Sequence, residues 1–210
     1  MKTFLFLGDS ITDSHRLWLP RNNGLGDGFV KILSDTAAEE HFSAVFINKG
    51  HDGFTLPSLI RNLPTDCFPC QPDFITVLIG INDIAVAKNC QSSFSKEDFS
   101  KQYEMLLEQI LSHTHAKILC MGPFLFPCPQ EYALWIGEIR LAEQAISSAA
   151  ARYGLPFLPL HDFLNDAAEH RGYDAITTDG IHLTVEGHRL LAGRWMKAIS
   201  RILTHSEIIS

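Results

Sequence analysis

The sequence predicts an α/β protein in which a parallel β-sheet lies between two layers of helices, in a single domain over residues 1–210. Three observations support this fold class. Short apolar runs alternate with helical patterns from one end of the chain to the other. No change in composition, internal repeat or linker interrupts the chain. Segments rich in glycine and polar residues, containing Ser10, Gly53 and Asn82, follow three of the runs, where ligands bind in open parallel sheets.

Five apolar segments are predicted to be the strands. Phe4–Leu7 has four apolar residues in a row, which is typical of a strand buried on both faces. The clearest strand is Phe74–Ile79, which is rich in β-branched residues and lies between Pro72 and Gly80. The other three strands are predicted at 43–47, 118–121 and 157–160.

Helical spacing of apolar residues predicts the segments that cover the sheet. The longest such helix spans 134–153 and ends before Gly154, and the last spans 185–202 with an apolar face that includes Trp195. Further helices are predicted at 26–40, at 56–63 and from about Ser95 to His113. The segments 11–24, 48–53, 64–72, 84–94 and 177–180 are predicted to be loops or connections.

Composition and charge limit the possible classes of function. The formal net charge is -7 and no dense Lys/Arg cluster is present, so we expect no nucleic-acid partner. No apolar stretch approaches the roughly 20 residues that a membrane helix requires, and the apolar run at the N-terminus is too short for a signal peptide. We therefore expect a cytoplasmic protein without stable membrane insertion. The sequence does not define an oligomeric state.

The five cysteines, an odd number, argue against a disulfide framework. Cys67 and Cys70 form a Cys-Phe-Pro-Cys pair, which can be a redox or zinc motif. A zinc site would need a second pair, which Cys90, Cys120 and Cys128 do not supply. A redox pair should open a helix directly after a strand, whereas this one lies among prolines. A structural role is therefore favoured for the pair.

Ser10 follows the first strand and could be a nucleophile if a base removes its proton. His182 is the candidate base, because Asp179 lies three residues before it and can hold its Nδ1 side while Nε2 faces Ser10. Asp162, which follows the fifth strand, is a rival for the acid that orients His182. The sequence alone favours Asp179 but does not exclude Asp162. His188, inside the last helix, is predicted to be structural. Each residue also has a purely structural interpretation, since Ser and Asp often cap helices.

Acyl transfer also needs donors aimed at the oxyanion that develops on the carbonyl. Gly53 can offer a backbone N–H, Asn82 a side-chain amide and Ser10 its own N–H. The alternative for Asn82 and Asp83 is a turn or helix cap, which is common after a strand.

Together these segments resemble the four blocks of the GDSL, or SGNH, hydrolases. The blocks are Gly8-Asp9-Ser10, the glycine in Asn48-Lys49-Gly50-His51-Asp52-Gly53, Gly80-Ile81-Asn82-Asp83 and Asp179-Gly180-Ile181-His182. Each block alone is weak, but all four occur in the family's order and span most of the chain. The resemblance implies a flavodoxin-like, three-layer α/β/α sandwich with a five-stranded parallel sheet. The lipase-type Gly-x-Ser-x-Gly motif is absent, which argues against the ordinary α/β-hydrolase fold.

The resemblance also implies roles for individual residues. Ser10 would be the nucleophile, His182 the base and Asp179 its partner, which places Asp179 well ahead of Asp162. The N–H groups of Ser10 and Gly53 and the amide of Asn82 would form the oxyanion hole. Gly53 is preferred to Gly50 because the family's glycine usually lies five residues beyond the Asn. The family is named after a Gly-Asp-Ser-Leu motif, and in this sequence Ile11 stands at the position of the Leu.

The leading functional interpretation is a metal-free, cofactor-free serine esterase that cleaves small acyl esters, sugar-linked or lipid-like, through an acyl-enzyme intermediate. An acyltransferase with the same Ser-His-Asp site is the nearest alternative, and the substrate class could be a carbohydrate O-acetyl ester or a lysophospholipid-type ester. Esters from acetyl to butyryl are predicted to react fastest. Candidates to line the pocket, or simply to pack in the core, are Trp18, 124–135 and 84–94.

Two interpretations from other classes are weaker. A flavodoxin-like binding module would need a phosphate-binding loop after the first strand, whereas Gly8-Asp9-Ser10 places a carboxylate there. A metal hydrolase would draw on His161, Asp162, His182 or His188, which do not show the usual ligand spacing on a helix.

Overall fold

The computed structural model describes residues 1–19 and 22–202 of the chain. Five parallel strands form one sheet in the order β2-β1-β3-β4-β5. The strands are β1 (Lys2–Gly8), β2 (Ala44–Gly50), β3 (Phe74–Leu78), β4 (Lys117–Met121) and β5 (Phe157–Leu158). The predicted α/β class with a five-stranded parallel sheet is therefore confirmed.

Strand β1 lies at the point where the strand order reverses. The chain passes from β1 to β2 on one side and then returns to β3 on the other, which places the C-terminal end of β1 at the switch point where α/β proteins bind ligands. Residues 4–7 of β1 are all buried, because helices cover both faces of the sheet. The ring of Phe4 stacks on those of Phe46 in β2 and Phe74 in β3, at centroid distances of 5.2 and 4.7 Å.

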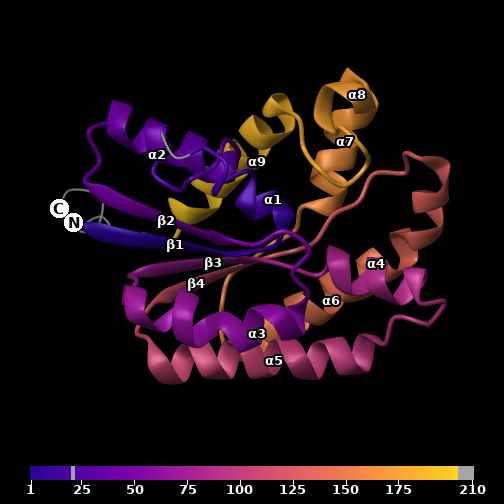
Figure 1. The fold of residues 1–210 in the computed structure, drawn as a ribbon, viewed down its shortest axis with the longest axis horizontal. Helices are drawn as coiled ribbons and strands as arrows, with labels where there is room; N and C mark the ends of the chain where they lie inside the picture. Colours follow the sequence, from indigo (N-terminus) through magenta and orange to yellow (C-terminus); the bar gives the residue numbers. More distant parts are fainter. Residues whose placement is uncertain (20–21, 203–210) are drawn as a thin grey trace.

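Helices cover the two faces of the sheet (Figure 1). One face carries α2 (Phe29–Glu39) and α9 (Val185–Ile199), and the other carries α3 (Leu56–Asp66), α5 (Lys96–His113) and α6 (Ile136–Arg152). Trp195 of α9 packs into the core and donates a buried hydrogen bond of 2.9 Å to Thr76 Oγ1 of β3. This arrangement is the predicted α/β/α sandwich.

Several element boundaries differ from the predicted ones. Strand β2 continues to Gly50, inside the predicted loop 48–53, because its backbone stays paired with β1 as far as Gly8. Helix α3 continues past Pro64 and ends at Asp66. Pro64 has no backbone N–H to donate, but it lies in the last turn, so only one hydrogen bond near the end of the helix is lost. The predicted helix 134–153 starts as a 3-10 turn, η3 (Gln130–Trp135), before α6. A second 3-10 turn, η2, spans Phe68–Cys70.

Four further helices lie where loops were predicted or no element was assigned: α1 (Ser10–Asp13), α4 (Ile81–Asn89), α7 (His161–Arg171) and α8 (Tyr173–Ile176). Helix α4 occupies most of the segment expected to be a polar loop, because Ile81 and Ile84 are buried one turn apart. Helix α7 buries only His161, Leu164 and Ala168, so its apolar stripe is too narrow to recognise among polar residues.

Some predictions extend beyond the described residues. Positions 20 and 21 of the predicted loop 11–24 and positions 203–210 of the predicted domain lie outside them. The single domain over 1–210 therefore stays a prediction. Over residues 1–19 and 22–202, none of the helices combines the length and apolar content that crossing a bilayer requires.

Candidate active site

Ser10 lies at the tight turn from β1 into α1. Asp9 caps α1, and its buried carboxylate accepts a hydrogen bond of 3.1 Å from the Ile11 N–H. Gly8 permits this turn, since a Cβ there would overlap the Thr12 side chain and the Leu78 carbonyl. As a result, the half-buried Ser10 is presented at the C-terminal edge of the sheet.

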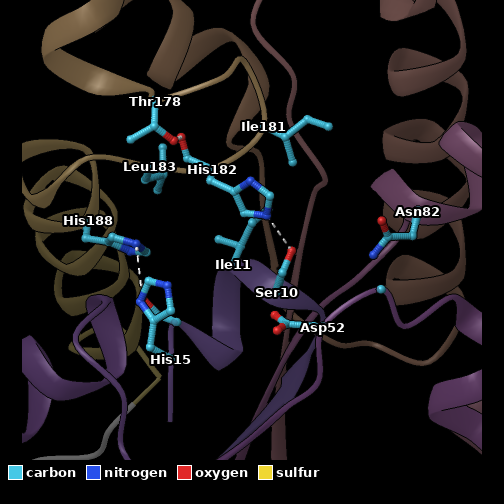
Figure 2. A pocket seen from close by; sticks show the side chains of 12 residues that line it. Ser10, Ile11, His15, Asp52, Asn82, Thr178, Ile181, His182, Leu183 and His188 are labelled. Atoms are coloured by element: carbon cyan, nitrogen blue, oxygen red, sulfur yellow. Dashed lines mark hydrogen bonds between the residues drawn. The ribbon is translucent and has the colours of Figure 1, made fainter. Parts of the chain in front are cut away.

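His182 reaches Ser10 from the loop before α9. Its Nε2 lies 2.9 Å from Ser10 Oγ, and its Nδ1 lies 2.6 Å from Asp179 Oδ2 (Figure 2). The other carboxylate oxygen of Asp179 accepts the backbone N–H groups of Ile181 and His182 at 2.9 and 2.7 Å. The loop thus holds a hydrogen-bonded Ser10–His182–Asp179 chain of the kind that activates a serine for attack.

The environment keeps Asp179 ionised. Burial opposes the charge, but hydrogen bonds from the His182 side chain and from the backbone N–H groups of His182 and Ile181 hold the pKa of Asp179 below its usual value. An ionised Asp179 requires a proton on Nδ1 of His182, which leaves Nε2 to accept the Ser10 proton. The rival acid, Asp162, bonds instead to Arg140 at 2.8 Å on the surface.

Asn82 and Gly53 line the same pocket as Ser10 and each carries an N–H group that can donate a hydrogen bond there. Asn82, in the first turn of α4, donates one amide N–H to the Phe54 carbonyl at 3.0 Å, which orients the amide and leaves its second N–H for a ligand. Gly53 is exposed, with a φ of +71°, a conformation that favours glycine. Gly50, by contrast, donates its N–H to Asn48 Oδ1 at 2.9 Å inside the fold. Of the two candidate glycines, Gly53 is therefore the one that borders the pocket.

Sequence reasoning missed two residues that hold the site together. Asp83 was considered only as part of a turn or cap, yet its carboxylate accepts the Leu56 N–H at 3.1 Å and ties α4 to the start of α3. Asn48 donates to the carbonyls of Thr12 and Leu25, at 2.6 and 2.9 Å. The signal available for both was a polar side chain shortly after a predicted strand.

Two buried carboxyl groups lie near the site. Burial raises the pKa of Asp9 to about 7, and the nearby Asp83 adds to this rise. Burial likewise raises the pKa of Asp83 to about 7, although the hydrogen bond from the Leu56 N–H acts to lower it. Near neutral pH each group is protonated part of the time, which lowers the negative charge close to Ser10.

The Ser10–His182 pair opens into a pocket of about 620 Å³. The predicted pocket residues do not line it: Trp18 is exposed, Phe124 is buried in the core, and α4 contributes only Asn82. The pocket is lined instead by aliphatic side chains, by Gly53 and by polar residues from loops and helices: Ser10, Ile11, Ser14, His15, Asp52, Gly53, Asn82, Thr178, Ile181, His182, Leu183 and His188.

The remaining candidate residues have structural surroundings. Burial raises the pKa of the Cys67 thiol to about 12, so the reactive thiolate is disfavoured there. His188 is buried in α9, and its Nδ1 accepts the Phe29 N–H at 3.2 Å. In the part of the chain that the structure describes, no three His, Cys, Asp or Glu side chains gather in a way that could hold a metal ion.

The fold and the site match a known class of hydrolases. Residues 6–190 match the GDSL-like Lipase/Acylhydrolase family, and the chain belongs to this family. The chain is 26% identical over 207 residues to an acetylxylan esterase of Geobacillus stearothermophilus, which covers 93% of this chain and 92% of that protein. The prediction of a serine ester hydrolase of the GDSL type is thereby confirmed.

Solved structures show the same fold. A putative GDSL-like lipase from Parabacteroides merdae superimposes with a TM-score of 0.86 at 23% identity, over 95% of each chain. An α/β hydrolase enzyme from the metagenome of Lake Arreo, Spain, gives a TM-score of 0.84 at 20% identity, over 97% of each chain. The flavodoxin-like arrangement that the resemblance implied is thus shared with these neighbours.

Proposed function

We propose that this protein hydrolyses short acyl esters, foremost acetyl esters of carbohydrates, through an acyl-enzyme formed on Ser10. The observation that carries the proposal is the hydrogen-bonded Ser10–His182–Asp179 chain, with distances of 2.9 and 2.6 Å, at the edge of an open pocket. The cytoplasmic location stays a prediction from the sequence.

The proposed reaction starts with attack of Ser10 Oγ on the ester carbonyl while His182 Nε2 takes the serine proton. The carbonyl oxygen becomes an oxyanion, which the N–H groups of Ser10 and Gly53 and the amide of Asn82 stabilise. Collapse of this intermediate breaks the bond to the alcohol, which leaves with the proton from His182. Water then attacks the acyl-enzyme and gives a proton to His182. His182 passes this proton to Ser10 Oγ as the bond between Ser10 and the acyl group breaks, which releases the carboxylic acid and free Ser10.

The pocket favours a short acyl group and a hydroxylated alcohol. Its aliphatic residues are Ile11, Ile181 and Leu183, and the polar loop side chains make up much of the remaining wall. The acetylxylan esterase among the relatives supports the same substrate class. A lysophospholipid-type substrate would instead require a long apolar surface for its acyl chain.

A panel of esters tests this proposal. We expect kcat/KM for p-nitrophenyl esters to be highest between two and four acyl carbons, and acetylated xylooligosaccharides to be deacetylated. An optimum at eight carbons or more would contradict the short-acyl assignment. If added alcohol diverted most of the acyl group from free acid to a new ester, the protein would be an acyltransferase instead.

A further inference from the structure

One wall of the pocket is polar and plays no part in the proposed chemistry. Figure 2 shows His15 and His188 on the opposite side of Ser10 from Asn82, with His182 between them. Ser14 and Thr178 line the same pocket. Asn82 thus lies on one side of Ser10, and the imidazole groups of His15 and His188 lie on the other.

The backbone is held in an unfavourable conformation to present this wall. Ser14 and His15, directly after α1, have φ values of 42° and 62°. Residues with a side chain adopt this left-handed region at a cost, which persists only where the surrounding structure imposes it, and such positions cluster at functional sites. Here both left-handed residues line the pocket beside Ser10.

Two glycines allow a neighbouring segment to close on these residues. A Cβ on Gly26 would overlap the Ser14 carbonyl, and a Cβ on Gly28 would lie 2.5 Å from Ser14 Oγ and 2.8 Å from the His188 ring. This close approach brings Asp27 against Ser14 and His15, which line the pocket, and its N–H donates to the Ser14 carbonyl at 2.8 Å.

Three side chains of this wall, those of Ser14, His15 and His188, form one hydrogen-bond chain with Asp27. Burial lowers the pKa of His188 to about 4, so its ring is neutral at neutral pH. Because its Nδ1 accepts the Phe29 N–H, its Nε2 carries the proton and points to Ser14 Oγ at 3.4 Å. Ser14 Oγ donates in turn to Asp27 Oδ1 at 2.9 Å, and His15 Nδ1 lies 3.2 Å from the same oxygen.

His15 and Asp27, at the outer end of this hydrogen-bond chain, are accessible to a ligand. The side chains of His15 and Asp27 are 70% and 51% exposed. Over residues 1–19 and 22–202, the structure records no hydrogen bond to the Nε2 atom of His15. A carboxylate and an imidazole held 3.2 Å apart offer the acceptors and donors that pair with neighbouring hydroxyl groups.

We propose that His15 and Asp27, supported by Ser14, form a subsite that binds hydroxyl groups of the alcohol part of the substrate, such as a sugar ring. This inference rests on the proposed esterase function. In the tetrahedral intermediate the oxyanion points to Asn82 and Gly53, so the alcohol leaves on a different side, where His182 can protonate it. The polar wall lies on that side of Ser10 (Figure 2).

The test compares two acetyl esters that differ only in the alcohol. Acetylated xylobiose offers hydroxyl groups to the subsite, whereas p-nitrophenyl acetate offers none. We expect His15→Ala and Asp27→Asn each to lower kcat/KM for acetylated xylobiose about tenfold, mainly through KM. His15→Ala removes a hydrogen bond to a hydroxyl group, and Asp27→Asn replaces a charged acceptor by a weaker, neutral one. For p-nitrophenyl acetate the same variants should lose several-fold less than for acetylated xylobiose, so the ratio of the two kcat/KM values should fall.

Matched controls separate binding from local structure. His41 is also an exposed histidine in left-handed backbone, with a φ of 56°, so His41→Ala controls for the backbone change. Asp35→Asn controls for the carboxylate, since Asp35 pairs with Lys31 on α2 and its side chain is 55% exposed. Neither control should change the ratio of the two kcat/KM values.

The outcomes distinguish this inference from the proposed function. Equal losses on both esters, or an unchanged ratio in both His15→Ala and Asp27→Asn, would overturn the subsite. Cleavage of p-nitrophenyl acetate by the wild type without cleavage of acetylated xylobiose would also overturn it, while leaving the esterase intact. Full activity of Ser10→Ala on p-nitrophenyl acetate would instead overturn the proposed mechanism. Asp27→Asn keeps the shape of the side chain, so the test does not depend on the folding of His15→Ala.

Discussion

At the scale of single residues, the structure separates two carboxylates that the sequence alone left in competition. Asp179 bonds to His182 Nδ1, whereas Asp162 bonds to Arg140. In Asp179→Asn the amide can still accept the backbone N–H groups, but it would present a donor to His182 and favour the wrong tautomer. We therefore expect kcat on p-nitrophenyl acetate to fall by roughly 10⁴.

Asp162→Asn is the matched control for that variant. It removes an exposed ion pair, which contributes about 0–1 kcal/mol to stability, and should leave kcat within about twofold. If Asp162→Asn proved to be the inactive variant and Asp179→Asn the active one, the orienting acid would be misassigned.

Asn82 allows a separate test of the oxyanion donors. Asn82→Ala removes a donor that acts mainly as charge develops, so kcat should fall on the order of 10²–10³ with little change in KM. Asn62→Ala is a suitable control, because Asn62 also donates to a backbone carbonyl, that of Ser58, within α3. An effect of Asn82→Ala on KM alone would remove Asn82 from the proposed oxyanion hole.

At the scale of elements, Asp83 connects the two helices that flank the oxyanion donors. Asp83→Ala leaves the Leu56 N–H without its acceptor, which should lower the free energy of unfolding by about 1–3 kcal/mol. It should also lower kcat, because the loop with Gly53 is no longer tied to α4. Asp83→Asn keeps an acceptor oxygen and should restore most of both quantities. Equal unfolding curves for wild type and Asp83→Ala in urea would contradict this role.

The same elements show what sequence reasoning could and could not predict. Strands β1 and β3 are recognisable because burial on both faces requires continuous apolar runs. Helices α4 and α7 were missed because only a few of their residues face the core. The candidate site residues stand in short motifs of glycine and polar residues, and the structure brings them to one pocket or into contact with it: Ser10, Asn82, Asp179 and His182. Ser14, His15 and Thr178 were not recognised as pocket residues, since their positions depend on how loops distant in the sequence pack.

At the scale of the whole molecule, the buried carboxyl groups make stability depend on pH. The pKa values of Asp9 and Asp83 rise from 3.8 to about 7 on folding. Between these values the folded protein holds protons that the unfolded chain has released, so the free energy of unfolding should fall as pH rises from about 4 through 7. Each group contributes at most about 4 kcal/mol to this decline.

The variant Asp83→Asn isolates one of these contributions, because it keeps the acceptor for Leu56 and removes the ionisation. Urea unfolding at pH 5 and pH 8 should show a smaller loss of stability in Asp83→Asn than in the wild type. His188 acts in the opposite direction: burial lowers its pKa to about 4, so its contribution is lost as pH falls from about 6.5 to 4. If the wild type and Asp83→Asn lost the same free energy of unfolding between pH 5 and pH 8, the raised pKa assigned to Asp83 would be contradicted.

The central claim, that Ser10 is the nucleophile, is tested most directly by covalent labelling with an organophosphonate ester and peptide mass spectrometry. The geometry predicts one adduct, on Ser10, formed in step with loss of esterase activity, because His182 Nε2 lies 2.9 Å from Ser10 Oγ and can accept its proton. His182→Ala should slow labelling by orders of magnitude, and Ser10→Ala should abolish it. An adduct on another serine that accompanies the loss of activity, or substantial ester turnover by Ser10→Ala, would contradict the claim.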